Sequence, residues 1–214
     1  MRPFNEVYHP WNWRGWWDYG TGALGDMGCH TVNMPFMGLD LRDPTVVEGK
    51  TSGHNKETFP GWSIGTYEVP QRGSRAPLQT FWYDGGKRPA LQKENDMPNY
   101  PEGTLFVGSD GMLIAQYGKH ELFPREKFAD FQRPPKTIPD SPGHADEWLA
   151  ACKTGSPTGT HFGYSGPLTE TVLLGTVAYR AGQKLQWDAE NLKVTNCLEA
   201  NQYVQREYRE GWTL

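Results

Sequence analysis

Short segments rich in β-branched and aromatic residues occupy the middle of the chain, with helical patterns before and after them. Turn residues separate these segments, and 25 glycines and 17 prolines in 214 residues favour many turns over a helical bundle. Because the segments do not alternate regularly with helices, the pattern predicts an α+β fold with a large open mixed or antiparallel β-sheet and helices packed on one face. The expected strands are residues 45–53, 62–69, 78–83, 105–107, 112–115, 185–187 and 193–195; the expected helices are 22–37, 144–153, 168–180 and 198–209; residues 119–142 are expected to form a long irregular loop.

Charge and hydropathy exclude several classes of protein. A net charge of −4 provides no basic surface for nucleic acid or for an anionic membrane. The chain has no apolar run of about 18 residues, and its N-terminus lacks the apolar segment of a signal peptide. Cys29, Cys152 and Cys197 are odd in number and widely spaced, so we expect packed, reduced thiols rather than a disulfide framework or a zinc site. We therefore expect a cytoplasmic protein.

The first predicted helix carries three polar side chains on one face. At about 100° per residue, Asp26 and His30 lie one turn apart, and Asn33 returns to within about 20° of Asp26. A histidine exchanges protons near neutral pH, and a carboxylate one turn away can orient it or bind a substrate hydroxyl. Asn33 can both donate and accept hydrogen bonds, which suits a polyol. Gly28 between them would permit close approach of a partner.

Two other interpretations of this face remain open on spacing alone. Asp26 can serve as a cap or dipole partner of the helix N-terminus, with His30 satisfied internally. A metal site is the second alternative, since residues four apart can ligate one ion, but the other histidines are scattered and we predict no metal.

The turn before this helix, Gly20-x-Gly22-x-x-Gly25, formally matches a dinucleotide-binding fingerprint. Such a fingerprint follows a buried, Val/Ile-rich parallel strand, whereas the residues before Gly20 are rich in tryptophan. Asp26 would also place a negative charge close to a docked pyrophosphate. We therefore predict no cofactor-binding residues in this turn and expect its glycines to let the backbone pass close to a ligand or another domain.

Four tryptophans, at positions 11, 13, 16 and 17, lie close together before the turn. Sugars present apolar C–H faces that pack on aromatic rings, while neighbouring polar groups such as Arg14 bind hydroxyls. Packing in a core or an interface is an equally good interpretation. Trp13, Arg14 and Trp17 are the candidate substrate-binding residues of this segment, together with Asn33.

The motif Asp26-x-Gly28-x-His30-x-x-Asn33 resembles the Asp-x-Gly-x-His-x-x-Asp segment of the glucose–fructose oxidoreductase / inositol dehydrogenase (Gfo/Idh/MocA) family. Residues 11–30 and the tail segments 164–170, 196–200 and 206–212 are similar to a bacterial subgroup of that family, so the resemblance spans almost the whole chain.

The resemblance implies that residues 1–214 are a single C-terminal substrate-binding and oligomerisation domain, without the N-terminal Rossmann domain that binds NAD or NADP. The Glu-Lys-Pro motif with the family's catalytic lysine does not occur in the sequence. The resemblance assigns His30 as the acid/base on the substrate hydroxyl and Asp26 as a substrate-binding, assisting residue. Asn33 stands at the position of the aspartate that ends the family motif. A role that needs a negative charge is therefore in doubt at this position.

The sequence and the resemblance together predict one half of an NAD(P)-dependent oxidoreductase acting on a sugar or cyclitol hydroxyl. We expect the chain to be inactive without a nucleotide-binding domain and to bind no cofactor by itself. The expected partners are a small sugar or polyol, the missing Rossmann domain, and a second copy that pairs through the open sheet face. The alternative is a non-catalytic carbohydrate-binding or oligomerisation module.

Overall fold

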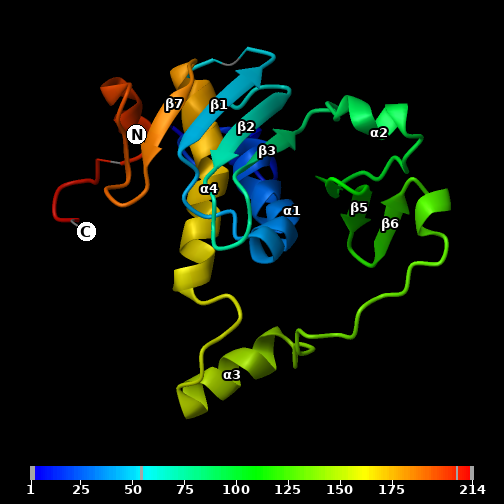
Figure 1. Cartoon of the computed structure of the whole chain (residues 1–214). Helices are drawn as coiled ribbons and strands as arrows, with labels where there is room; N and C mark the ends of the chain where they lie inside the picture. The colour runs from blue at the N-terminus through cyan, green and yellow to red at the C-terminus, as the bar shows by residue number, and fades with distance from the viewer. Residues whose placement is uncertain (1–2, 54, 206, 213–214) are drawn as a thin grey trace.

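A computed structural model describes residues 3–53, 55–205 and 207–212. Its larger sheet has five strands in the order β3-β2-β1-β7-β8, and neighbouring strands pair antiparallel (Figure 1). The strands are β1 (Val46–Thr51), β2 (Ser63–Val69), β3 (Leu78–Tyr83), β7 (Leu185–Asp188) and β8 (Lys193–Val194). The α+β fold class is confirmed, and the paired strands of the described residues are antiparallel rather than mixed.

Strand β2 shows why this sheet has one covered and one open face. Its buried residues alternate with half-buried ones, so that Tyr67 and Val69 belong to one face and Thr66 and Glu68 to the other. Alternate side chains of a strand point to opposite faces, so one face contributes to the core and the other stays accessible. On the accessible face, Phe81 of β3 is 52% exposed.

Two long helices, α1 (Gly22–Leu39) and α4 (Phe162–Ala181), pack against each other and cover the other side of the sheet (Figure 1). Their contact depends on Gly28: a Cβ atom built there would lie 2.7 Å from Cγ1 of Val172. Val172 is fully buried, so the glycine lets the two helix backbones approach closely. The partner that Gly28 admits is therefore α4 of the same chain.

A second, three-stranded antiparallel sheet has the order β4-β5-β6 and lies to the side of the larger one (Figure 1). It consists of β4 (Thr104–Val107), β5 (Met112–Gln116) and β6 (Lys119–Phe123). Its small core contains Met97, Ile114 and Phe123, and the short helix α2 (Ala90–Glu94) precedes it. The Thr104 hydroxyl donates a hydrogen bond to the Thr31 carbonyl of α1 (3.2 Å), which ties this sheet to the helical layer.

Helix α3 (His144–Thr154) stands apart from both sheets (Figure 1). None of its residues is buried. An extended segment, residues 129–143, leads to it from the short 3-10 helix Glu126–Phe128, and residues 155–161 lead from it to α4. The other 3-10 helices are Glu6–Tyr8, Asn12–Gly15 and Leu198–Tyr203. Among the described residues, we find no helix whose length and hydropathy would let it span a lipid bilayer.

Several predicted boundaries are wrong. The expected loop 119–142 contains β6, because Phe123 pairs with Met112 and completes the small core. Helix α4 begins six residues earlier than predicted and continues through Pro167, since the amides of Tyr164 and Ser165 both donate to the His161 carbonyl. Helix α1 continues through Pro35, as the predicted range 22–37 requires, and ends at Leu39, just beyond that range; Pro35 and Phe36 are buried there.

The last predicted helix, 198–209, is also wrong. The structure has a 3-10 helix, Leu198–Tyr203, whose one buried residue is Ala200, and Arg206 lies outside the described residues. The Asn201 side chain takes part in backbone hydrogen bonds there: its Oδ1 accepts from the Val194 amide, and its Nδ2 donates to the carbonyls of Val194 and Leu198. The other predicted strands and helices are present, with ends shifted by up to two residues.

Candidate functional site

The N-terminal segment lies against the start of α1 and residues 57–59. The Trp17 amide donates to the Glu57 carbonyl (2.9 Å), and the Phe59 amide donates to the Gly15 carbonyl (2.9 Å). The Tyr8 ring packs edge-on against Trp16, with centroids 4.9 Å apart. These contacts hold the tryptophan-rich segment next to the polar face of α1.

Two of the predicted site residues form an ion pair. Nη1 of Arg14 donates to Oδ2 of Asp26, and both side chains are half-buried. The Arg14 guanidinium also lies 3.9 Å from the centre of the Trp11 ring, a cation–π contact. The carboxylate of Asp26 is thus held in one orientation by a residue of the tryptophan-rich segment.

His30 lies one turn further along α1 and is exposed. Its ring makes no hydrogen bond or ion pair with another described residue. An imidazole in this position can take up or release a proton at a bound molecule, because neither ring nitrogen is committed to a described neighbour.

The side chain of Asn33, unlike the His30 ring, is hydrogen-bonded within the protein. The Tyr164 hydroxyl of α4 donates to Oδ1 of Asn33 (2.5 Å), and the Tyr164 ring packs edge-on against Phe36 (5.5 Å between centroids). Partial burial raises the pKa of Tyr164, an effect that Arg42 opposes, so the hydroxyl remains a donor near neutral pH. This bond turns the Asn33 amide so that its NH2 group is the part left for another acceptor.

Asp26 and His30 lie away from the buried side of α1, whereas Asn33 is bonded to Tyr164, which packs against the core. Leu24, Gly28 and Pro35 are the buried residues on the other side of the helix, about 160–200° from Asp26. Asp26 is half-buried and His30 exposed, so neither lies beneath hydrophobic neighbours. Of the three side chains the His30 ring is exposed, whereas those of Asp26 and Asn33 are half-buried and bonded to Arg14 and Tyr164.

The two candidate tryptophans have different environments. Trp13 is 47% exposed, so its ring is accessible to a ligand. Trp17 packs against the core formed by α1 and α4, with its ring 6.0 Å from Tyr179 and 4.7 Å from the Arg180 guanidinium. Its Nε1 is buried without an acceptor. Trp13 is therefore better placed for a sugar than Trp17, whose role at a substrate stays a prediction.

The glycine-rich turn contacts its own chain. A Cβ atom at Gly20 would meet the backbone of Arg14, and one at Gly22 would meet the Phe59 side chain. The turn follows a 3-10 helix and not the buried strand that precedes a dinucleotide-binding fingerprint. These residues do not fit a nucleotide phosphate, because the space that the glycines leave open is filled by the protein itself.

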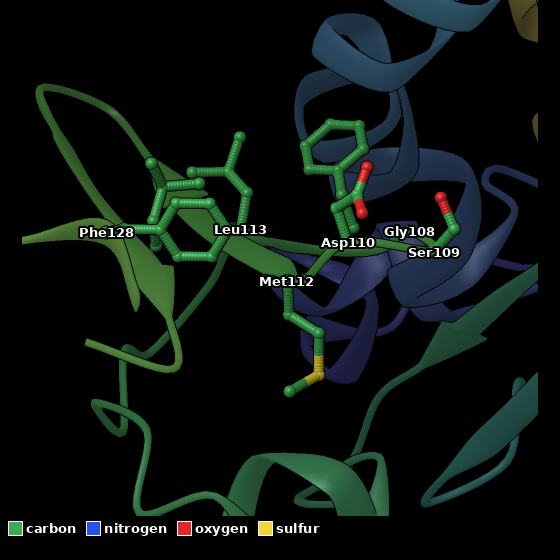
Figure 2. A pocket seen from close by; sticks show the side chains of 9 residues that line it. Gly108, Ser109, Asp110, Met112, Leu113 and Phe128 are labelled. Carbon is green, nitrogen blue, oxygen red and sulfur yellow. The ribbon is translucent and has the colours of Figure 1, made fainter. Parts of the chain in front are cut away.

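Two hollows of the surface lie away from this face. Both are on the small sheet, with volumes of about 300 and 400 Å³, and neither is lined by Asp26 or His30. In Figure 2, Leu113 and Phe128 lie beside each other in the first hollow, while Met112 projects to the opposite side of the sheet. All three cysteines are free thiols. Among the described residues, no group of three or more His, Cys, Asp or Glu side chains is placed to hold a metal ion.

Tyr164 is a residue at this face that sequence reasoning missed as a site residue. It is separated from Asn33 by 131 positions, and no spacing rule connects the two. Only the packing of α1 against α4 brings them together.

The structure is thus an α+β domain in which Asp26 and His30 lie one turn apart on the first long helix. The chain belongs to the Gfo/Idh/MocA oxidoreductase family: residues 1–214 match its C-terminal alpha/beta domain. A comparison with curated proteins gave no match. Membership in this family implies a small-molecule substrate, a partner N-terminal domain, and chemistry that is generally NAD(P)-dependent.

Proposed function

We propose that this domain supplies the substrate-binding and acid/base half of an NAD(P)-dependent oxidoreductase acting on a sugar or cyclitol hydroxyl. One observation carries the proposal: the exposed His30 lies one turn from Asp26 on the outward face of α1, and Arg14 holds the Asp26 carboxylate in place. Family membership supports the reaction class.

In the proposed reaction His30 accepts the proton of the substrate hydroxyl while the carbon that bears this hydroxyl loses a hydride. A nicotinamide held by a separate nucleotide-binding domain would accept this hydride, which would leave a carbonyl compound and a protonated His30 imidazole. Asp26 binds a neighbouring hydroxyl and orients the substrate toward the imidazole. In the reverse direction His30 returns the proton to the carbonyl oxygen.

Asn33 and Trp13 complete the substrate contacts in this proposal. The Asn33 NH2 group donates to a substrate oxygen, because its Oδ1 already accepts from Tyr164. Trp13 offers an exposed ring to the apolar face of a sugar. An amide at position 33 makes a neutral contact where other family members have a charged one.

The nicotinamide in this proposal is held by a separate nucleotide-binding domain, and residues 1–214 act as one C-terminal domain. The described residues support this division, since the glycine-rich turn is filled by Arg14 and Phe59. We further propose that the open face of the larger sheet pairs two copies, with the exposed Phe81 in the contact, and that the protein works in the cytoplasm, where free thiols stay reduced.

The test is thermal protection of the chain by polyols, with myo-inositol and D-glucose as the probes. Binding is expected to raise the melting temperature by at least about 2 °C at a concentration well above Kd. His30→Ala and Asp26→Ala should each abolish this shift, whereas His144→Ala, which changes another exposed histidine, should retain it. Protection that survives in both site variants would contradict the proposal.

In an enzyme that also contains the nucleotide-binding domain, His30→Ala is expected to lower kcat by about 10²–10⁴-fold. The alternative function, a carbohydrate-binding module without chemistry, is favoured by the exposed Trp11 and Trp13 rings beside Arg14. That alternative predicts sugar binding that needs Trp13 and survives His30→Ala, so the same variants separate the two functions.

A further inference from the structure

Arg180, in the last turn of α4, has its guanidinium over two aromatic rings from other parts of the chain. Its Cζ lies 4.2 Å from the ring centre of Tyr203, in the 3-10 helix Leu198–Tyr203, and 4.7 Å from the ring centre of Trp17, in the tryptophan-rich segment. Arginine stacks readily on aromatic faces, and the N–H groups that are not turned toward a ring stay free to donate hydrogen bonds. Three segments of the chain thus hold one cation in place.

The donors of this cation have no acceptor in the described part of the chain. Arg180 is half-buried, yet it makes no hydrogen bond or ion pair with another described residue. The other half-buried arginines there all donate to a carboxylate or a carbonyl oxygen: Arg14, Arg42, Arg72 and Arg75. A half-buried charge without an acceptor has lost water and gained no hydrogen bond in return, so Arg180 has unused binding capacity.

The electrostatic surroundings of Arg180 favour an anion. Burial lowers the pKa of its guanidinium, and the groups that oppose this effect are Tyr203 and Tyr179, with no carboxylate among them. Arginine stays protonated near neutral pH in any case. The nitrogens of Arg180 are not fully shielded from solvent, whereas Nε1 of Trp17 is. A ligand can therefore reach the edge of the guanidinium but not the indole N–H.

We propose that the Arg180 guanidinium binds a small oxyanion, a carboxylate or a phosphate group, and that the rings of Trp17 and Tyr203 are the platform that orients it. The planar fork of N–H donors matches two oxygens of either group. An anion in this place replaces the water that the half-buried cation has lost.

This site is distinct from the face with Asp26 and His30. Arg180 lies about two turns, or about 12 Å, further along α4 than Val172, the residue that packs on Gly28. The Asp26 carboxylate is bonded to Arg14 and is therefore not the missing counter-ion. The inference is independent of the proposed function.

The first experiment measures the melting temperature of the 214-residue chain in sodium phosphate and in sodium malonate, each at about 50 mM, against sodium chloride of equal ionic strength. At least one of the two oxyanions is expected to raise Tm by about 2 °C or more. A shift with phosphate alone identifies a phosphate site, and a shift with malonate alone identifies a carboxylate site. No shift with either anion would overturn the proposal.

The shift has to depend on Arg180, because phosphate also stabilises proteins through its exclusion from their surface. Arg180→Gln removes the charge and should abolish the shift. Arg180→Lys keeps the charge without the fork and should weaken binding at least about fivefold in Kd. Arg209→Gln is the matched control, since Arg209 is exposed and lies 4.9 Å from the ring centre of Trp212, and it should leave the shift unchanged.

Equal shifts in the wild type and in Arg180→Gln would contradict the proposal. Circular dichroism checks the fold of each variant, and Arg180→Lys, the milder change, decides the result if the glutamine variant does not fold. The anion shift should persist in His30→Ala, and its loss there would contradict a separate site.

The second experiment tests the aromatic platform by isothermal titration calorimetry. Tyr203→Phe keeps a ring beside the guanidinium and should leave Kd within about twofold of the wild type. Tyr203→Leu keeps apolar bulk without a ring and should weaken binding at least about fivefold. Equal affinities of these two variants would show that the ring does not orient Arg180.

Discussion

Glu170 of α4 is a half-buried carboxylate whose environment changes its protonation. Burial raises its pKa, the hydrogen bond from Nε1 of Trp187 (2.7 Å) opposes this effect, and the charge of Asp43 adds to it. A folded-state pKa above the unfolded value means that the folded chain binds the proton more tightly. The contribution of Glu170 to the free energy of unfolding is therefore greatest at low pH, and it decreases as the pH rises above 4.5, the ordinary pKa of a glutamate.

Replacement of this carboxylate tests the sign of the effect. Glu170→Gln keeps an oxygen that can accept from Trp187 and removes the charge. At pH 7 we therefore expect the free energy of unfolding to equal that of the wild type or to exceed it by less than about 1 kcal/mol. The gain is small because the side chain is partly solvated. At pH 4 this gain in unfolding free energy should vanish. Denaturant unfolding at both pH values measures the difference between variant and wild type, and Glu190→Gln, at an exposed glutamate, is the control. A larger benefit at pH 4 than at pH 7 would show that the sign is wrong.

At the scale of elements, the crossing of α1 and α4 positions the candidate site. It brings Tyr164 to Asn33 and turns the face with Asp26 and His30 outward. Gly28 permits this crossing, since any side chain there would press on Val172. Gly28 lies in sequence between Asp26 and His30, but its structural role is on the opposite side of the helix.

Gly28→Ala is expected to destabilise the protein by about 1–3 kcal/mol, because the new methyl group forces the packed helices apart. Gly38→Ala in the same helix is the control: a Cβ atom there meets nothing within 4 Å, and better helix propensity should stabilise by about 0.5–1 kcal/mol. Urea denaturation compares the two variants. If both changed stability equally, the close contact would not be the cause.

At the scale of the whole molecule, the proposed function assigns the nucleotide site to another domain. Fluorescence titration of the chain with NADH and NADPH is therefore expected to show no binding tighter than about 1 mM, a level typical of non-specific contact. Its tryptophan fluorescence provides the readout. A low-micromolar Kd for either nucleotide would contradict this division of labour.

Much of the fold could be predicted from local patterns. The strand Leu78–Tyr83 and its neighbours follow from β-branched and aromatic residues between turns, and α3 follows from its 3,4 spacing and the stop at Gly155. Strand β6 could not be predicted in this way, because its only strong signal is the pairing with β5. The start of α4 was missed for a related reason, since a proline inside a helix is tolerated only through contacts that the local sequence does not specify.

For the candidate site, the sequence alone determined which chemical groups share one face of α1, because the helical period is a property of the backbone. The tertiary structure decided which of them are accessible. It pairs Asp26 with Arg14, leaves His30 exposed, joins Asn33 to Tyr164 and packs Trp17 into the core. Contacts between residues far apart in the chain depend on how helices and sheets pack, and that packing is set by the shapes of all the surfaces together.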